Sequence, residues 1–125
     1  MGALFIYLYI DDQKRRVLID TGSPVSFMPQ TKGTQSSQIF STVSGQVFTT
    51  FEREPHKVAD ESSRSTMWKF YGAHINTPIV GTDFLKHCNA IINFEDLTVK
   101  FGDRGKRRFA CSVLRNGDNR VGGGK

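Results

Sequence analysis

One short segment constrains the fold of this 125-residue chain more than any other: residues 17–23 have the sequence Val-Leu-Ile-Asp-Thr-Gly-Ser. Three consecutive apolar residues predict a strand whose end is buried. Asp20 emerges directly from that strand, and the turn-forming pair Thr21-Gly22 follows it. Because Asp and Gly are favoured at any strand end, the segment alone is compatible with an ordinary turn or with a functional carboxylate.

A second element of the same kind lies further along the chain. Ile79-Val80-Gly81 again places a glycine after a short buried strand, and a helix start follows it. Thr82 or Asp83 is the expected N-cap of this short helix, which we expect to end near His87. The second element strengthens the functional interpretation of Asp20.

Short apolar runs between turn residues predict an all-β chain. One hairpin is expected over residues 4–20, with a polar turn at 11–14, and it would deliver Asp20 at a strand end. Another is expected over residues 90–101, with its turn at Glu95-Asp96. Residues 25–29 form another short apolar run, and further strands are expected at residues 67–71 and 79–81.

The middle of the chain is less regular. Ser44-Gly45 is a turn signal within a β-rich run, so we expect a hairpin whose tip lies there. Ile39, Phe40 and Val43 have the spacing of inward-facing residues on its short strands. Residues 53–66 are polar and charged with little pattern, which predicts a long surface loop or a weak edge strand.

The basic character of the chain is confined to its C-terminal end. Residues 103–125 carry seven Lys or Arg and two Asp, which accounts for the whole net charge of +5. We therefore divide the chain into a domain, residues 1–102, and a basic flexible tail, residues 103–125. The tail is interpreted as a solvated linker, with incidental RNA affinity as the alternative. The neutral domain predicts no specific nucleic-acid partner.

Cysteine content and hydropathy indicate the cellular compartment in which we expect the chain to act. Cys88 and Cys111 form neither a metal-binding spacing nor a disulfide framework, so we expect a reducing, cytoplasmic compartment and no metal or cofactor. The longest apolar run, residues 3–10, is far shorter than the roughly 20 residues that a membrane span needs. We expect neither a membrane partner nor a signal peptide.

The two glycine elements together resemble the retropepsins, the single-domain aspartic proteases of retroviruses and LTR retrotransposons. Residues 18–23 match their active-site strand and turn. Thr-Pro-Ile-Val-Gly-Thr-Asp-Phe-Leu at 77–85 is similar to a segment of gypsy-class retrotransposon proteases, and residues 67–70 look like the aromatic strand before it. Residues 80–102 also resemble the end of the retropepsin-like domain in DNA-damage-inducible proteasome-shuttle proteins. The resemblance covers residues 4 to about 102.

The resemblance implies a closed β-barrel with one short C-terminal helix, acting as a symmetric homodimer. Amide hydrolysis of this type needs two carboxylates that share one proton. The chain has a single Asp-Thr-Gly, and capping of the helix start accounts for Asp83. The second catalytic carboxylate must therefore be Asp20 of another copy, related by two-fold symmetry.

Other roles are implied residue by residue. Thr21 would interlock with its symmetry mate, Gly22 would let the substrate backbone approach, and residues 44–46 would form a mobile flap over an extended peptide. Ser23, where many retropepsins have Ala, would either donate a hydrogen bond to Asp20 or only serve the turn. The apolar candidates are equally compatible with a place in the core. The predicted set is catalytic Asp20, Thr21 and Gly22, with substrate-binding Ser23, Val25, Phe27, Ser44, Gly45, Gln46, Val47, Ile79 and Val80.

The function implied by the resemblance is that of an aspartic endopeptidase that matures a retroelement polyprotein. A host protease of the proteasome-shuttle type is the alternative within enzymes. A dimerisation or peptide-binding module without activity is the alternative outside them, and the intact Asp-Thr-Gly argues against it.

Overall fold

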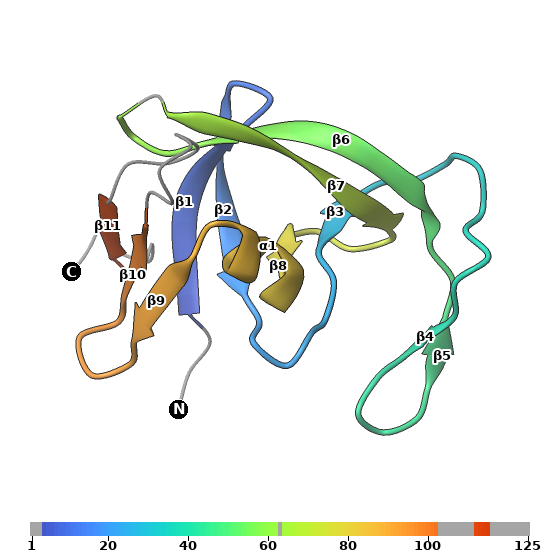
Figure 1. Ribbon diagram of the computed structural model, residues 1–125. Helices are drawn as coiled ribbons and strands as arrows, with labels where there is room; N and C mark the ends of the chain where they lie inside the picture. Colours follow the sequence, from blue (N-terminus) through green and yellow to red (C-terminus); the bar gives the residue numbers. More distant parts are fainter. Residues whose placement is uncertain (1–3, 63, 103–111, 116–125) are drawn as a thin grey trace.

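The structure is a computed structural model that describes residues 4–62, 64–102 and 112–115. Six strands close into a barrel in the order β1-β2-β8-β3-β7-β6 (Figure 1). One short helix, α1 (Thr82–His87), lies against it, so the predicted all-β barrel with a single helix is confirmed. The barrel strands are β1 (Leu4–Ile10), β2 (Gln13–Ile19), β3 (Phe27–Pro29), β6 (Phe51–Ala59), β7 (Ser65–Ala73) and β8 (Ile79–Val80).

The first hairpin carries Asp20 to the end of β2. Strands β1 and β2 pair antiparallel from Leu4↔Ile19 to Ile10↔Gln13, and only Asp11 and Asp12 lie between them. Both turn residues have left-handed φ angles, 52° and 71°, as a two-residue turn of type I′ requires. Asp tolerates this conformation better than most residues, which explains the Asp-Asp pair at the turn.

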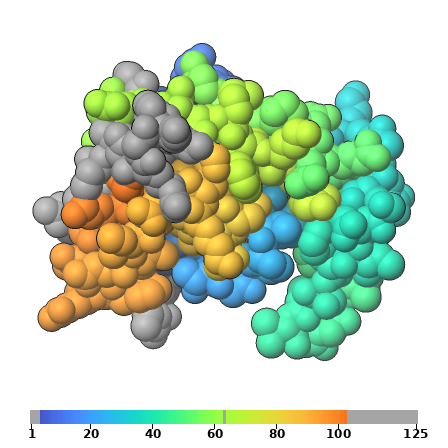
Figure 2. Space-filling view, viewed as in Figure 1, coloured from blue at the N-terminus to red at the C-terminus, as the bar shows by residue number. Residues whose placement is uncertain are grey.

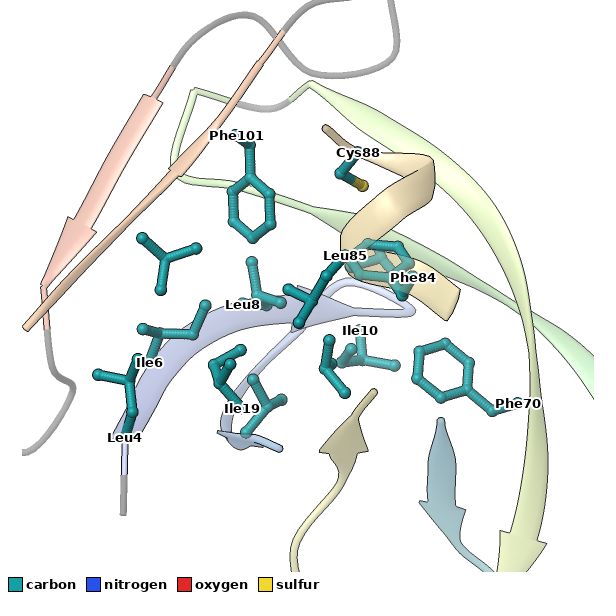
Figure 3. Packing of buried hydrophobic residues seen from close by; sticks show 14 of the residues in the cluster. Leu4, Ile6, Leu8, Ile10, Ile19, Phe70, Phe84, Leu85, Cys88 and Phe101 are labelled. Atoms are coloured by element: carbon teal, nitrogen blue, oxygen red, sulfur yellow. The ribbon is translucent and has the colours of Figure 1, made fainter. Parts of the chain in front are cut away.

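The hydrophobic core fills the barrel and the space under α1. Strand β1 alternates strictly, with Leu4, Ile6, Leu8 and Ile10 buried. Figure 3 shows three aromatic rings that reach the same interior from different elements. These fully buried rings belong to Phe70 on β7, Phe84 on α1, and Phe101 on β10 (Thr98–Phe101).

Residues 53–59 and 65–66 lie in strands, so the long loop that was one of our two predictions for residues 53–66 is wrong. They belong to the β6–β7 hairpin, which has the longest strands of the barrel. Strand β6 pairs with β1 only through Val58 and Ala59, and Phe51 at its start bridges to Gln35, so residues 53–56 form an edge, as the second alternative predicted. Pro55 fits there because an edge strand has no neighbour that needs its missing N–H. Exposure on both faces removes the alternation that would have revealed the strand.

The expected middle hairpin is present as β4 (Phe40–Ser41) and β5 (Val47–Phe48), with Gly45 in its turn at φ 91°. It stands away from the barrel, at the right of Figure 1. The prediction that Ile39 and Val43 point inward is wrong, because both are highly exposed. A two-stranded arm has little interior of its own, so only Phe40 and Phe48 of its apolar residues are partly buried.

A second sheet, in the order β11-β10-β9, extends from the barrel beside α1. The predicted hairpin over residues 90–101 is confirmed as β9 (Ala90–Asn93) and β10. Strand β11 (Ser112–Arg115) pairs with β10, so these four residues are not part of an unstructured tail. The rest of the predicted tail, with Cys111, lies outside the described residues. No helix in the described part of the chain has the length and hydropathy to cross a membrane.

We expect Asp11→Asn to destabilise the protein near neutral pH but not in acid. Partial burial raises the pKa of the Asp11 carboxyl. Hydrogen bonds with His56 Nδ1 (2.6 Å) and from the Lys57 N–H (3.0 Å), together with the charges of both residues, outweigh this effect and leave the pKa below its ordinary value. The ionised carboxylate therefore stabilises the fold above the unfolded-state pKa, about 4, and this contribution is lost as pH falls through the folded-state pKa. Urea midpoints of both proteins should differ at pH 7 and converge near pH 2; an unchanged difference would contradict the assignment.

Candidate active site

The two glycine elements of the sequence lie side by side in the barrel. Strands β2 and β8 pair in parallel, with Leu18 opposite Ile79 and Ile19 opposite Val80. The Asp20 N–H then donates to the Val80 carbonyl at 2.9 Å. The end of β2 is thus held by the strand that precedes Gly81, and this fixes the backbone from which the Asp20 side chain projects.

Asp20 is a half-buried carboxylate in a tight turn. Its Oδ1 accepts a hydrogen bond from the Gly22 N–H at 3.0 Å, and its backbone carbonyl accepts one from the Ser23 N–H at 3.1 Å. Thr21 and Gly22 are exposed next to it. The turn therefore holds the carboxylate with one backbone donor on Oδ1.

A cleft of about 370 Å³ separates this turn from the β4–β5 hairpin. Figure 2 shows the hollow between the hairpin and the segment that contains the turn. Asp20 is the only ionisable side chain among the described residues that line it. The lining residues are Asp20, Gly22, Ser23, Pro24, Phe27, Phe40, Ser41, Thr42, Val43, Phe48, Ala73, Ile75 and Ile79.

Aromatic rings join the hairpin to the barrel at one side of the cleft. Phe40 and Phe48 are cross-strand partners at the base of the hairpin, and their ring centroids lie 5.3 and 5.8 Å from that of Phe27 on β3. Phe40 also packs edge-on against Tyr71 of β7, at 5.0 Å. Such contacts anchor the base of the hairpin, whereas Val43 in its turn is fully exposed.

The structure separates the predicted substrate-binding residues into three groups. Ser23, Phe27 and Ile79 line the cleft with Asp20 and Gly22. Val80 is fully buried in the core, so its predicted place in a pocket is wrong, and half-buried Val25 does not line the cleft either. Residues 44–47 form the exposed outer part of the hairpin, beyond the cleft lining.

Sequence reasoning missed the lining residues at the base of the hairpin and on the far wall. Phe40 and Phe48 each lie four residues from Ser44 in the predicted turn, and this spacing could have marked them as a cross-strand pair. Ala73 is the last residue of β7 and Ile75 lies two residues beyond it, and neither belongs to a recognisable pattern. Only the closure of the barrel brings them to the cleft.

Ser23 serves the turn. Its hydroxyl donates to the Val25 carbonyl at 2.7 Å and makes no hydrogen bond to Asp20. The alternative in which Ser23 donates to the Asp20 carboxylate is therefore wrong for this structure. The hydroxyl has a single proton, which is used in the hydrogen bond to the Val25 carbonyl. Ser23 therefore gives no reason to expect an acid-shifted pH–rate profile.

We expect Gly81→Ala to destabilise the fold by about 1–3 kcal/mol and to displace the Asp20 turn. A Cβ at Gly81 would lie 2.3 Å from the Val25 carbonyl oxygen and 2.5 Å from that of Ser23, and both are backbone atoms that cannot rotate away. Thermal unfolding would measure the loss of stability, and hydrogen exchange of the Asp20 N–H, which donates to the Val80 carbonyl, would report displacement of the turn. For stability, Gly45→Ala is the control, because a Cβ there meets nothing within 4 Å and strains only the exposed hairpin turn, at φ 91°. An equal loss of stability in the two variants would contradict the close packing of Gly81 against the Ser23 and Val25 carbonyls.

Among the described residues, no group of three or more His, Cys, Asp and Glu side chains is placed to hold a metal ion. The chemistry that this arrangement can perform is that of a single half-buried carboxylate lining a mainly apolar cleft.

This architecture is the retropepsin-like aspartic protease fold, and solved structures of that kind superimpose on it. The protease of EIAV, in complex with the inhibitor HBY-793, aligns with a TM-score of 0.57 and 20% identity over 74% of this chain and 94% of its own. The retroviral protease-like domain of Ddi1 from Leishmania major aligns with a TM-score of 0.62 and 14% identity, over 95% and 99% of the two chains. No family model and no curated protein matches the sequence.

Proposed function

We propose that this chain is an aspartic endopeptidase that acts as a homodimer, with one Asp20 from each copy. The observation that carries the proposal is the position of Asp20: a lone carboxylate on the Asp-Thr-Gly turn of a retropepsin-like barrel, at the floor of a cleft that contains no other ionisable side chain among the described residues. A single carboxylate cannot act as acid and base at once. The chemistry is complete only when a second copy supplies its own Asp20.

In the dimer, the two carboxylates share one proton because two like charges at short distance do not both ionise readily. The ionised Asp20 takes a proton from a water molecule as that water attacks the scissile carbonyl. The protonated Asp20 donates a hydrogen bond to the carbonyl oxygen, which gains negative charge. The Gly22 N–H on Oδ1 holds each carboxylate in place for this exchange.

The β9–β10 hairpin offers a surface for the second copy. Within the described residues, β9 pairs only with β10, so its outer edge is free to pair with another strand. Ile91 of β9 is 60% exposed, and Phe94 and Leu97 in the turn are exposed as well. An apolar edge strand of this kind suits an isologous, two-fold contact.

The cleft suits an extended peptide with large apolar side chains. Its walls are mainly aromatic and aliphatic, and the β4–β5 hairpin stands opposite the Asp20 turn, where it can close over a bound strand as a flap. We propose a retroelement polyprotein as the natural substrate, cut in the cytoplasm or in a virus-like particle.

A host protease of the proteasome-shuttle type is the second candidate. The likeness to the Leishmania major Ddi1 domain extends over 95% of this chain, against 74% for the EIAV protease, and this favours it. The sequence on either side of this domain discriminates the two, because a reverse transcriptase downstream or a ubiquitin-like domain upstream would assign it.

Cleavage of a peptide library, mapped by mass spectrometry, tests the proposed activity. We expect cuts between large apolar residues that stop when pepstatin is added. Parallel incubation of Asp20→Asn identifies cleavage by a contaminating protease. A purified dimer that cuts no peptide in the library would favour a binding module instead.

A further inference from the structure

The hydrogen bonds of Asp83 extend beyond the helix in which it lies. The N-cap of α1 is Gly81, which has extended backbone and no side-chain cap, so the prediction of Thr82 or Asp83 as N-cap is wrong. Asp83 lies in the first turn, and its Oδ1 accepts the Phe84 N–H at 2.7 Å. The same carboxylate accepts two more hydrogen bonds from other parts of the barrel, which capping does not explain.

These two bonds come from Ser26 and Trp68. The Ser26 hydroxyl, just before β3, donates to Asp83 Oδ1 at 2.7 Å, and the Trp68 indole N–H on β7 donates to Oδ2 at 3.1 Å. Three donors thus converge on one side chain. A carboxylate accepts all three without conflict, because it has lone pairs on both oxygens and no proton of its own when ionised.

Ser26 passes this connection on to the Asp20 turn. Ser26 is completely buried. Its Oγ accepts a hydrogen bond from the Gly81 N–H at 2.9 Å, while its hydroxyl donates one to Asp83. Gly81 packs directly against the Ser23 carbonyl, and the next N–H, that of Thr82, donates to the same carbonyl at 2.8 Å. A continuous series of contacts therefore runs from the indole of Trp68 to the residue that closes the Asp20 turn.

We infer that Asp83 is a positioning residue for Asp20, acting through Ser26 and Gly81, and this rests on the proposed peptidase function. Asp83 does not line the cleft, so it touches no substrate. Its role requires a carboxylate and not just a polar side chain. An Asn at this position would direct its NH₂ group either at the Trp68 N–H or at the donors of Ser26 and Phe84.

Asp83→Asn should lower kcat by roughly tenfold to a hundredfold, because small displacements of reacting groups have effects of this size. The KM should stay within about threefold, since the cleft walls are unchanged. Adding Trp68→Phe removes the indole N–H that opposes the new amide, so the double variant should recover most of the lost kcat. Trp68→Phe alone is the control for the lost packing of the indole ring.

Amide signals give a readout that does not depend on catalysis. In ¹⁵N-labelled protein, Asp83→Asn should increase the hydrogen exchange of the Gly81 N–H and shift the Gly22 resonance, whose N–H binds Asp20. The double variant should return both toward the parent. If the parent cuts no peptide, the proposed function fails, but these signals still test the connection from Asp83 to the turn.

Either of two results would overturn the inference. One is an Asp83→Asn protein that is less stable yet has the parent's kcat per folded molecule and unchanged Gly22 and Gly81 signals. The other is a double variant whose kcat is no higher than the value expected when the fold-losses of Asp83→Asn and Trp68→Phe are simply multiplied. Should Asp83→Asn not fold, Ser26→Ala breaks the same connection one step nearer the turn and must show the same fall in kcat.

Discussion

Asp20→Asn is expected to abolish peptidase activity while leaving the fold intact. The change is nearly isosteric, and the amide oxygen can still accept the Gly22 N–H that holds the side chain at 3.0 Å. The pair of side chains in the dimer, however, no longer contains a group that can take a proton from water. We expect kcat to fall by roughly a hundredfold or more, as for the loss of a general acid–base pair.

The measurement is kcat/KM on one peptide for both proteins, with thermal unfolding as the check on folding. Asp83→Asn, which also replaces a half-buried carboxylate with its amide, is the comparison, because its loss of activity should be smaller and should be recovered in the double variant with Trp68→Phe. Residual activity of Asp20→Asn within about tenfold of the parent would show that Asp20 is not catalytic.

Specific activity is expected to fall on dilution, because a site shared by two copies exists only in the dimer. Ile91→Lys should move this fall to concentrations at least roughly tenfold higher. The residue is 60% exposed on the free edge of β9, and a two-fold axis would bring each new lysine near its symmetry mate. Activity and sedimentation, measured over the same range of concentration, report the two effects together.

Met67→Lys provides the matched control. Met67 is similarly exposed, at 56%, but lies on β7 of the barrel instead of the β9 sheet. It should leave the dilution curve unchanged. Equal shifts from both variants would show that charge alone, and not the β9 edge, affects assembly.

The barrel could be predicted from the sequence where local pattern and burial agree. Strand β1 alternates over its whole length, and the apolar runs before Asp20 and Gly81 are largely shielded from solvent, so each could be predicted from the sequence. Strand β6 could not, because its earlier part lies on an edge and its side chains are exposed. Pairing with β7 holds it in place, and pairing leaves no mark on the composition of the strand itself.

The candidate site divides in the same way. Asp20, Thr21 and Gly22 form one contiguous segment, so sequence alone located the turn. The far wall depends on Ala73 and Ile75, which reach the cleft only through closure of the barrel. The sequence did not reveal the roles of Val80 and Asp83. The Val80 side chain is buried in the core, and the Asp83 carboxylate joins a hydrogen-bond network with Trp68.

Mixing of parent and Asp20→Asn subunits tests the central claim most directly. If each site needs Asp20 from both copies, only parent–parent dimers are active, and the rate follows the square of the parent fraction. An equal mixture of freely exchanging subunits at constant total concentration should then retain about a quarter of the parent's rate. A rate that falls in direct proportion to the parent fraction, to about half, would show that one Asp20 suffices and would contradict a site shared between two copies.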